Sequence, residues 1–165
     1  MADLEQAKEN PRGQLWEELE DIPAGMLGLA GSDQHMQPMA PQIDRAQNRI
    51  LFFTKRDSDL VKSMHGNQTA KFTFIGEDHD YHACIHGALR VNTDRSIIEQ
   101  HWNPVVDAWY DEGKDDPNLV LLEFKPDEAA VWASTDSSLK FGWEIAKAKF
   151  GNSEPDVGVR THVTF

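Results

Sequence analysis

The chain of 165 residues is long enough for one domain with a substantial core, since a chain of this size buries roughly 70% of its unfolded surface. Its composition, 39% hydrophobic and 27% charged, is that of a globular protein and not of a disordered one. A net charge of −12, from 28 acidic and 16 basic residues, repels nucleic-acid phosphates and anionic lipid headgroups, so we expect neither nucleic acid nor a membrane as a partner.

Cysteine usage and apolar patterning bear on where the protein works. Cys84 is the only cysteine, so no disulfide can form within the chain. The first residues lack the basic and then apolar pattern of a secretory signal, and the longest apolar runs are far too short to cross a bilayer. We therefore expect a cytoplasmic protein.

The first third of the chain predicts a helix and a β-hairpin. Apolar residues recur at helical spacing from Pro11 until Pro23, where the helix should end. The apolar stretch 25–31 is bounded by glycines, as a buried strand would be, and a turn signal at 31–33 leads to a second strand over 35–43.

The middle of the chain predicts three strands and one short helix. Residues 50–55 form a β-branched and aromatic run, and Ser58 lies in a cluster typical of a helix N-cap, ahead of one helical turn at 60–64. Residues 71–75 and 81–91 alternate apolar and polar side chains with period two, as antiparallel strands do.

Two short helices and an interrupted strand follow. Asp94 and Pro104 mark the starts of the two helices, because each residue type is common at such a position. Strand patterns at 119–124 and 129–133 are separated by Lys125-Pro126-Asp127, and a proline is poorly tolerated inside a sheet, so we expect an interruption there.

The last residues predict one more helix and a weak strand. Ser137 or Ser138 can cap an amphipathic helix that runs to about Phe150, and the weak alternation of 159–165 suggests a terminal strand after a loop at 151–158. Many short strands, tight turns and no regular alternation of strand and helix favour a mainly β protein, an antiparallel barrel with appended helices.

The end of the 50–55 strand carries the best candidate for an anion site. Thr54, Lys55, Arg56 and Ser58 bring two hydroxyls, two cations and the start of a helix, a combination that can bind a phosphate. The alternative is a solvated turn, which is the commoner role of a Lys-Arg pair at a strand end.

A second constellation is a group of histidines with the cysteine. His79, His82, Cys84 and His86 lie within eight residues and could ligate zinc, another transition metal or a haem. On a strand only the last three would share one face, and no further ligand pair follows at the spacing of a structural zinc site. A polar strand face is the simpler interpretation.

Three ordered motifs resemble those of a known family. They are Gln37-Pro38-Met39, the run from Ile50 to Thr54 with Ser58 beyond it, and the stretch from Trp109 to Pro117, WYDEGKDDP. Over roughly residues 22–150 the chain resembles the general stress protein branch of the pyridoxamine 5′-phosphate oxidase-like, FMN-binding split-barrel family. The resemblance implies a six-stranded antiparallel split β-barrel over 23–150, an N-terminal tail and helix at 1–22, and a C-terminal tail at 151–165.

The resemblance also implies a flavin phosphate site. In the family, a Thr and a Ser at the spacing of Thr54 and Ser58 hold the FMN phosphate together with a lysine two positions after the Ser. This chain has Leu60 at that position. The missing charge must then come from another lysine, for which the candidates are Lys55, Lys62 and Lys71.

The flavin ring would lie against a different set of residues. Gln37-Pro38-Met39 matches a strand that usually reads Arg-Pro-Met and lines the ring edge; a neutral Gln can hydrogen-bond the ring but cannot stabilise an anionic reduced form by charge. Phe53 is a candidate from the matching 50–54 run, and Trp109 or Tyr110 is expected near the ring.

The implied function is flavin binding in a homodimer. The cofactor would be FMN, with FAD as the alternative, held between subunits, and the protein would be a flavin-dependent oxidoreductase of unknown substrate, with no catalytic acid or base that can be named. One alternative is a flavin-binding or sensing protein without turnover, and another is a metal or haem barrel that uses the His79–His86 cluster. True pyridoxamine 5′-phosphate oxidase activity is not expected, because the surroundings of Arg160-Thr161-His162 do not match.

Overall fold

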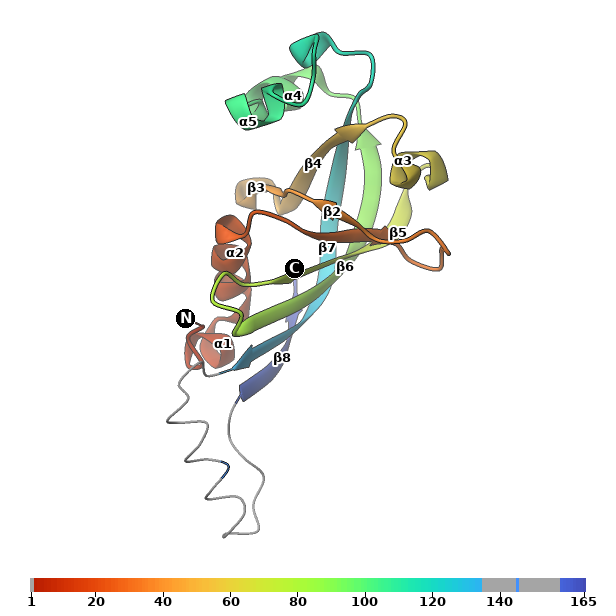
Figure 1. Ribbon diagram of the computed structural model, residues 1–165. Helices are drawn as coiled ribbons and strands as arrows, with labels where there is room; N and C mark the ends of the chain where they lie inside the picture. Colours follow the sequence, from red (N-terminus) through yellow and green to blue (C-terminus); the bar gives the residue numbers. More distant parts are fainter. Residues whose placement is uncertain (1, 135–144, 146–157) are drawn as a thin grey trace.

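The computed structural model describes residues 2–134, 145 and 158–165, and these form one curled antiparallel sheet with short helices (Figure 1). The helices are α1 (Gln6–Glu9), α2 (Pro11–Asp21), α3 (Asp59–Ser63), α4 (Arg95–His101) and α5 (Pro104–Asp107), with 3-10 turns η1 (Arg45–Gln47) and η2 (Gly113–Asp115). The strands are β1 (Gly25–Leu29), β2 (Gln37–Met39), β3 (Gln42–Asp44), β4 (Arg49–Lys55), β5 (Gln68–Ile75), β6 (Tyr81–Asn92), β7 (Leu119–Ser134) and β8 (Gly158–Thr164).

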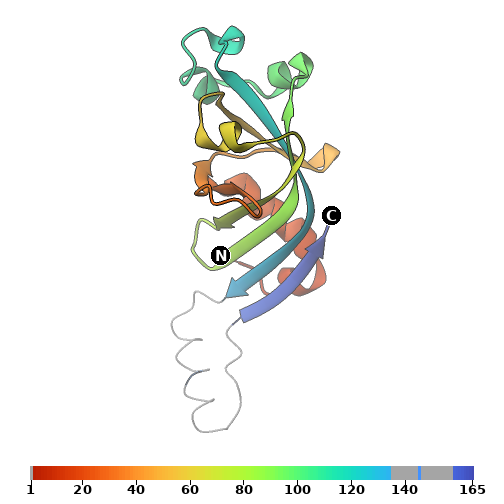
Figure 2. The same ribbon diagram turned by 90° about the vertical axis from the view of Figure 1, so that its right-hand side faces the viewer.

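The sheet curls into a split barrel, which confirms the predicted fold class. Its strand order is β2-β1-β5-β6-β7-β4-β3, with β8 paired to the second half of β7. The long strands β6 and β7 run the length of the molecule, and α4 and α5 lie together at one end of them (Figures 1 and 2). Every helix within the described residues is too short or too polar to span a membrane.

The strand expected at 35–43 is in fact two strands, so the count rises above the predicted six. β2 pairs with β1, whereas β3 pairs with β4 on the opposite side of the sheet. Pro41 lies between them, and a residue without a backbone N–H cannot continue a hydrogen-bonded ladder. β8 is the eighth strand, where the sequence suggested a terminal strand.

The expected interruption at 125–127 is wrong, because β7 is continuous from Leu119 to Ser134. Gly87 pairs with Pro126 and His86 with Glu128, so Asp127 is an extra residue in a β-bulge. The bulge accommodates Pro126 within a long strand. A Cβ atom at Gly87 would collide with the Lys125 carbonyl oxygen, so the bulge also requires glycine at this position.

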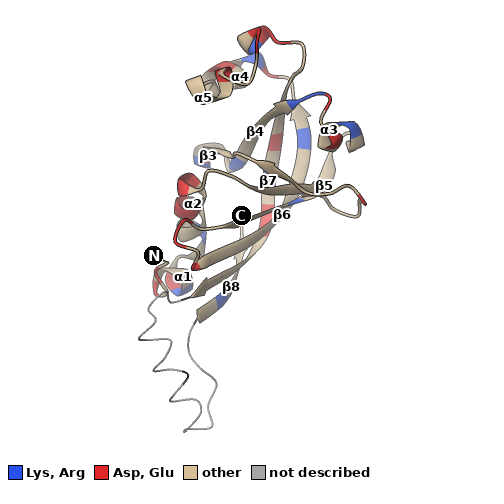
Figure 3. Cartoon of the chain, viewed as in Figure 1, with Lys and Arg blue, Asp and Glu red and all other residues tan. Residues whose placement is uncertain are grey.

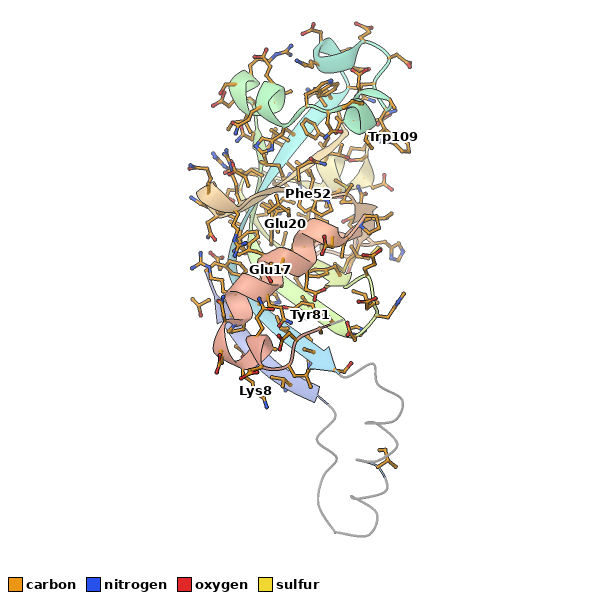
Figure 4. All side chains as sticks on the ribbon, turned by 90° about the vertical axis from the view of Figure 1, so that its left-hand side faces the viewer. Lys8, Glu17, Glu20, Phe52, Tyr81 and Trp109 are labelled. Atoms are coloured by element: carbon orange, nitrogen blue, oxygen red, sulfur yellow. The ribbon has the colours of Figure 1, made fainter. Side chains whose placement is uncertain are left out.

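The core is a cluster of aromatic and aliphatic side chains inside the curled sheet. The rings of Phe52 and Phe72 lie 5.0 Å apart, and Phe74 stacks on Tyr81 at 6.1 Å. Figure 4 shows Phe52 in the interior and Tyr81 beside α2. α2 contacts both β3 and β8, so the N-terminal helix and the C-terminal strand share the core with the region predicted as the barrel domain.

The expected helix from Ser137 or Ser138 to Phe150 lies outside the described residues, apart from Ile145. The other predicted helices begin close to their expected positions. α2 starts at Pro11, α4 is capped by Asp94, and α5 starts at Pro104.

A buried carboxylate joins the three strands at the centre of the sheet. Glu123 of β7 accepts hydrogen bonds from Arg49 of β4 at 3.0 Å and from Arg90 and Asn92 of β6 at 2.8 Å each. Arg49 also pairs with Asp44 at 2.7 Å. Burial by itself would raise the pKa of Glu123, but these three donors outweigh it and hold the pKa below its usual value.

We predict that Glu123→Gln destabilises the fold by about 3 kcal/mol, because it removes one of the two buried carboxylates that pair with Arg49. The contribution of Glu123 is complete above its unfolded pKa near 4.5 and is lost as the pH falls through the lower folded pKa. Urea denaturation of the wild type and of this variant between pH 3 and 7 should therefore converge at the acidic end.

The matched control is Glu128→Gln on the same strand, because the Glu128 side chain is 68% exposed. It should unfold like the wild type throughout the pH range, since exposed pairs contribute little. An equal loss in both variants would show that the Glu123 cluster does not stabilise the sheet specifically.

Candidate functional site

A hollow of about 520 Å³ lies between β2, the end of β4 and the helix α5. This volume is in the range of small-molecule sites. Its lining is mostly apolar and aromatic, with amide and hydroxyl groups, one lysine and one carboxylate, that of Asp57. The lining residues are Gln37, Pro38, Met39, Ala40, Gln42, Phe53, Thr54, Lys55, Asp57, Ser58, Val105, Val106, Trp109 and Tyr110.

The wall formed by β2 is an edge of the sheet. β2 pairs with β1 and ends the strand order, so one side of its backbone has no strand partner among the described residues. Met39 is buried, whereas Gln37 is partly exposed and Pro38 exposed. This edge can therefore offer backbone groups and the Gln37 amide to a planar, polar ligand edge.

The end of β4 forms the floor, and α5 forms the roof above it. The Tyr110 hydroxyl donates to the Thr54 carbonyl oxygen at 2.7 Å, which joins the segment after α5 to β4. Burial raises the pKa of Tyr110 to about 12, so the hydroxyl keeps its proton at neutral pH and remains the donor. Phe53 and Trp102 meet edge to face at 5.6 Å below the helices.

The start of α5 is tied down by Asn103. Its side-chain oxygen accepts from the backbone N–H groups of Val105 and Val106 at 3.0 and 3.1 Å, the usual role of an N-cap. Its amide nitrogen donates to the Gln42 side-chain oxygen at 3.3 Å. One residue therefore both begins the helix and connects it to the far wall of the hollow.

The roof presents exposed apolar side chains. Trp109 is 70% exposed and Val105 74% exposed, and the two lie four residues apart at the rim. Figure 4 shows Trp109 at the end of the molecule away from α1. Large apolar groups at the mouth of a hollow are typical of a surface that a ligand or a partner covers.

The polar end of the hollow lies between β4 and α3, where Figure 3 shows a basic stretch at the strand end. Among the described residues that line the hollow, Lys55 is the one cation. No described residue forms an ion pair with its ammonium group. The Ser58 hydroxyl oxygen caps α3 by accepting from the Val61 N–H at 3.3 Å, which leaves its hydrogen available for a ligand. α3 has only five residues, so its dipole adds little to an anion site.

The structure brings together eight of the ten residues that we expected at a site. Gln37, Pro38, Met39, Phe53, Thr54, Lys55, Ser58 and Trp109 all line the hollow. Lys62 lines a neighbouring hollow instead, and Lys71 lies on the exposed face of β5.

Arg56 of the local anion motif and Leu60, which stands where the family has a lysine, do not line the hollow. The Arg56 guanidinium donates to the Pro117 carbonyl oxygen at 3.3 Å, so it fixes the loop before β7 and does not line the hollow. Leu60 has no exposed surface and belongs to the core. A side chain at position 60 therefore faces the interior, in agreement with the leucine found there.

Sequence reasoning did not name Ala40, Gln42, Asp57, Val105 or Val106 as lining residues. The spacing of Val105 and Trp109, four residues apart, was a signal for the apolar roof, although α5 itself ends at Asp107. Gln42 reaches the hollow only because β3 pairs with β4, and no local pattern shows that pairing.

The histidine cluster does not form a metal site in the described part of the chain. No group of three His, Cys, Asp or Glu side chains there is arranged to hold a metal ion. His82, Cys84 and His86 lie on β6, while His79 occupies a turn with a positive φ of 63°. Nothing in this geometry favours the alternative of a metal or haem barrel.

The family model for pyridoxamine 5′-phosphate oxidase-like proteins matches residues 10–156. The chain belongs to this family. The match covers the strands β1 to β7, the residues that line the hollow and the helices α4 and α5. It confirms the family that the sequence motifs indicated.

Solved structures of general stress proteins resemble the chain over most of their length. A protein assigned as general stress protein 26 from Jannaschia sp. CCS1 is 35% identical, with 94% of this chain and 99% of that chain covered and a TM-score of 0.78. The general stress FMN/FAD binding protein from Xanthomonas citri is 38% identical, with 75% and 89% covered and a TM-score of 0.69.

A curated relative matches over a shorter stretch. General stress protein 26 from Bacillus subtilis is 35% identical over 49 residues, which is 30% of this chain and 34% of the relative. The chain thus spans about a third of that relative's length in the match.

We predict that Tyr110→Phe loosens the roof and lowers stability by roughly 1–3 kcal/mol, because the buried Thr54 carbonyl oxygen loses its donor. Amide hydrogen exchange in residues 104–110 should accelerate. Tyr81→Phe is the matched control, since the buried Tyr81 hydroxyl has no hydrogen-bond partner among the described residues. If the control loses as much stability as Tyr110→Phe, the hydrogen bond to Thr54 does not hold the roof.

Proposed function

We propose that the hollow between β2, β4 and α5 binds a flavin, with FMN as the expected cofactor and FAD as the alternative. The proposal rests on one observation: a single hollow has an apolar roof, a polar strand edge as one wall, and an end that carries hydroxyl groups and a lysine. This set fits a molecule with a flat ring at one end and a phosphate at the other. The relative from Xanthomonas citri, named an FMN/FAD binding protein, supports the proposal.

Each end of the hollow has a distinct role in this proposal. Gln37 and the backbone of β2 hydrogen-bond the polar edge of the ring, and Trp109 covers its face. Thr54, Ser58 and Lys55 hold the phosphate, and Lys55 supplies the charge that Leu60 cannot.

The chemistry would come from the cofactor, since a bound flavin supplies two-electron redox chemistry. The lining residues orient the ring and exclude water from one side of it. Among the described lining residues, Tyr110 keeps its proton at neutral pH and donates it in a hydrogen bond to the Thr54 carbonyl oxygen. This hydroxyl therefore cannot serve as a catalytic acid or base. We propose a flavin-dependent oxidoreductase whose substrate is unknown, working in the cytoplasm.

A flavin-binding or sensing protein without turnover is the second candidate. The neutral amide of Gln37 favours it, because this group cannot stabilise an anionic reduced ring by charge. Anaerobic addition of NADH or NADPH to the flavin-loaded protein separates the two candidates. Bleaching of the flavin within seconds supports the oxidoreductase, and an unchanged oxidised spectrum supports the binding protein.

We predict that Lys55→Ala lowers the affinity for FMN at least roughly tenfold, because it removes a charge-assisted hydrogen bond to the phosphate. Quenching of flavin fluorescence during titration with the apoprotein measures this affinity. Lys71→Ala is the matched control, since this lysine is exposed on β5 away from the hollow. Equal FMN affinities for both variants and the wild type would show that Lys55 does not bind the phosphate.

We also propose a homodimer in which the second subunit covers the exposed rim. Trp109, Val105 and Trp132 are large apolar side chains with substantial exposure, and association would bury them. A flavin that contacts both subunits must then stabilise the dimer by mass action.

We predict that the midpoint of thermal unfolding rises with both protein and FMN concentration. Trp109→Ala should lower flavin affinity even at protein concentrations that keep the chain dimeric, whereas Trp132→Ala should lower it only where the dimer dissociates, because Trp132 does not line the hollow. Sedimentation that shows a folded monomer with full FMN affinity at micromolar concentration would contradict the shared site.

A further inference from the structure

The side-chain amide of Asn103 is held in one orientation by four hydrogen bonds. Its oxygen accepts from the backbone N–H groups of Val105 and Val106, as the cap of α5. Its nitrogen donates to the His101 carbonyl oxygen at 3.4 Å and to the Gln42 side-chain oxygen at 3.3 Å. Turning the amide over would place its NH₂ group against two N–H donors, so the cap fixes which end of Asn103 faces Gln42.

Asn103 in turn sets the orientation of the Gln42 amide. The nitrogen of Asn103 is a donor, so the Gln42 atom that faces it must be an acceptor, and this atom is the side-chain oxygen. The Gln42 nitrogen, Nε2, then carries two hydrogens that no described residue accepts. Because Gln42 lines the hollow from β3, this donor is available to a ligand in the hollow.

The other amide on the lining, that of Gln37, has the opposite polarity. Its nitrogen donates to the Met39 sulfur at 3.7 Å, and its oxygen has no donor among the described residues. The walls of the hollow therefore offer an amide acceptor at Gln37 and an amide donor at Gln42. The pyrimidine end of a flavin ring carries an N–H group flanked by carbonyl oxygens, so it can use both kinds of partner.

The other side-chain donors of the lining that we have described serve different purposes. The Tyr110 hydroxyl donates to the Thr54 carbonyl oxygen. Lys55 and Ser58 lie at the end of the hollow that we assign to the phosphate. A donor for the ring must then come from the wall formed by β3, where Gln42 lies.

We propose that Gln42 donates a hydrogen bond from Nε2 to an acceptor atom of the bound flavin ring and that Asn103 positions it for this role. The inference rests on the flavin site proposed above and adds a ring-binding residue and a positioning residue to it. Reduction makes the ring richer in electrons, so a donor at a ring oxygen or nitrogen binds the reduced form more tightly than the oxidised form. Gln42 therefore raises the reduction potential of the flavin.

Gln42→Leu tests the ring contact, because it removes the donor and keeps a side chain of similar size. We expect oxidised FMN to bind about threefold more weakly and reduced FMN about thirtyfold more weakly, since the hydrogen bond strengthens on reduction. The tenfold difference lowers the two-electron reduction potential by about 30 mV. Flavin fluorescence measures the first affinity, and equilibration with a redox dye of known potential measures the shift.

The matched control is Gln47→Leu, the same substitution at an exposed glutamine of η1 that does not line the hollow. It should leave both the FMN affinity and the potential at their wild-type values. An equal shift in Gln42→Leu and Gln47→Leu would overturn the proposed ring contact.

Asn103→Asp tests the positioning role. Aspartate caps a helix as well as asparagine does but has no donor, so Gln42 must turn its nitrogen toward the new carboxylate and its oxygen toward the hollow. We expect the potential to fall at least as far as in Gln42→Leu. When Gln42→Leu is already present, Asn103→Asp should add little, because no amide remains to be turned. A full additional shift would overturn the positioning role, since the new charge would then act by itself.

The outcomes also separate this inference from the flavin site. A wild type that binds FMN, with Gln42→Leu at the same affinity and potential, would overturn the inference and leave the flavin site standing. Equal losses for oxidised and reduced FMN would overturn it too, because Gln42 would then contribute only packing. A wild type that binds no flavin would overturn both proposals.

Discussion

The position of the candidate site depends on the ion cluster around Glu123. This carboxylate is buried where β4, β7 and β6 run side by side, and its hydrogen bonds come from both neighbouring strands. A buried charge is costly unless every partner is present, so the cluster disfavours slippage of these strands. The registers of β4 and β6 against β7 are thereby tied together near the end of the sheet that carries α4 and α5.

The same cluster extends toward the helices. Arg49 connects Glu123 to Asp44, and the His101 side chain at the end of α4 lies 3.8 Å from Asp44. Burial lowers the pKa of His101 although Asp44 opposes this, so the ring is neutral near pH 7 and forms no full salt bridge. The ion cluster therefore ends at Asp44, and the roof beyond it is held by neutral hydrogen bonds from Asn103 and Tyr110. We infer that the roof opens at a lower free energy than the sheet, which suits a site that a ligand must enter.

Much of this fold follows from local sequence patterns. The alternation of 81–91 and the cap at Asp94 predicted their elements, because period and capping are local properties. The continuity of β7 through Pro126 was not predictable, since it depends on Gly87 in another strand making room for a bulge. The division of 35–43 into β2 and β3 likewise depends on which distant strand each half meets.

The residues of the candidate site were likewise predictable only in part. Thr54 and Ser58 were predictable from their spacing and residue types, whereas Gln42 lines the hollow only through strand pairing. Spacing could not rank Lys55, Lys62 and Lys71, because the direction of each side chain is set by its element: the end of β4, the outer side of α3 and the open face of β5. Leu60 shows the reverse case, where an unexpected residue type is explained by a side chain that faces the core.

The central claim is that the hollow under α5 is a flavin site, and a crystal structure of the protein grown with FMN tests it most directly. We predict electron density for the ring between the Gln37–Met39 edge and Trp109, with the phosphate beside Thr54, Lys55 and Ser58. A flavin bound at another place on the molecule, with this hollow occupied only by solvent, would contradict the account.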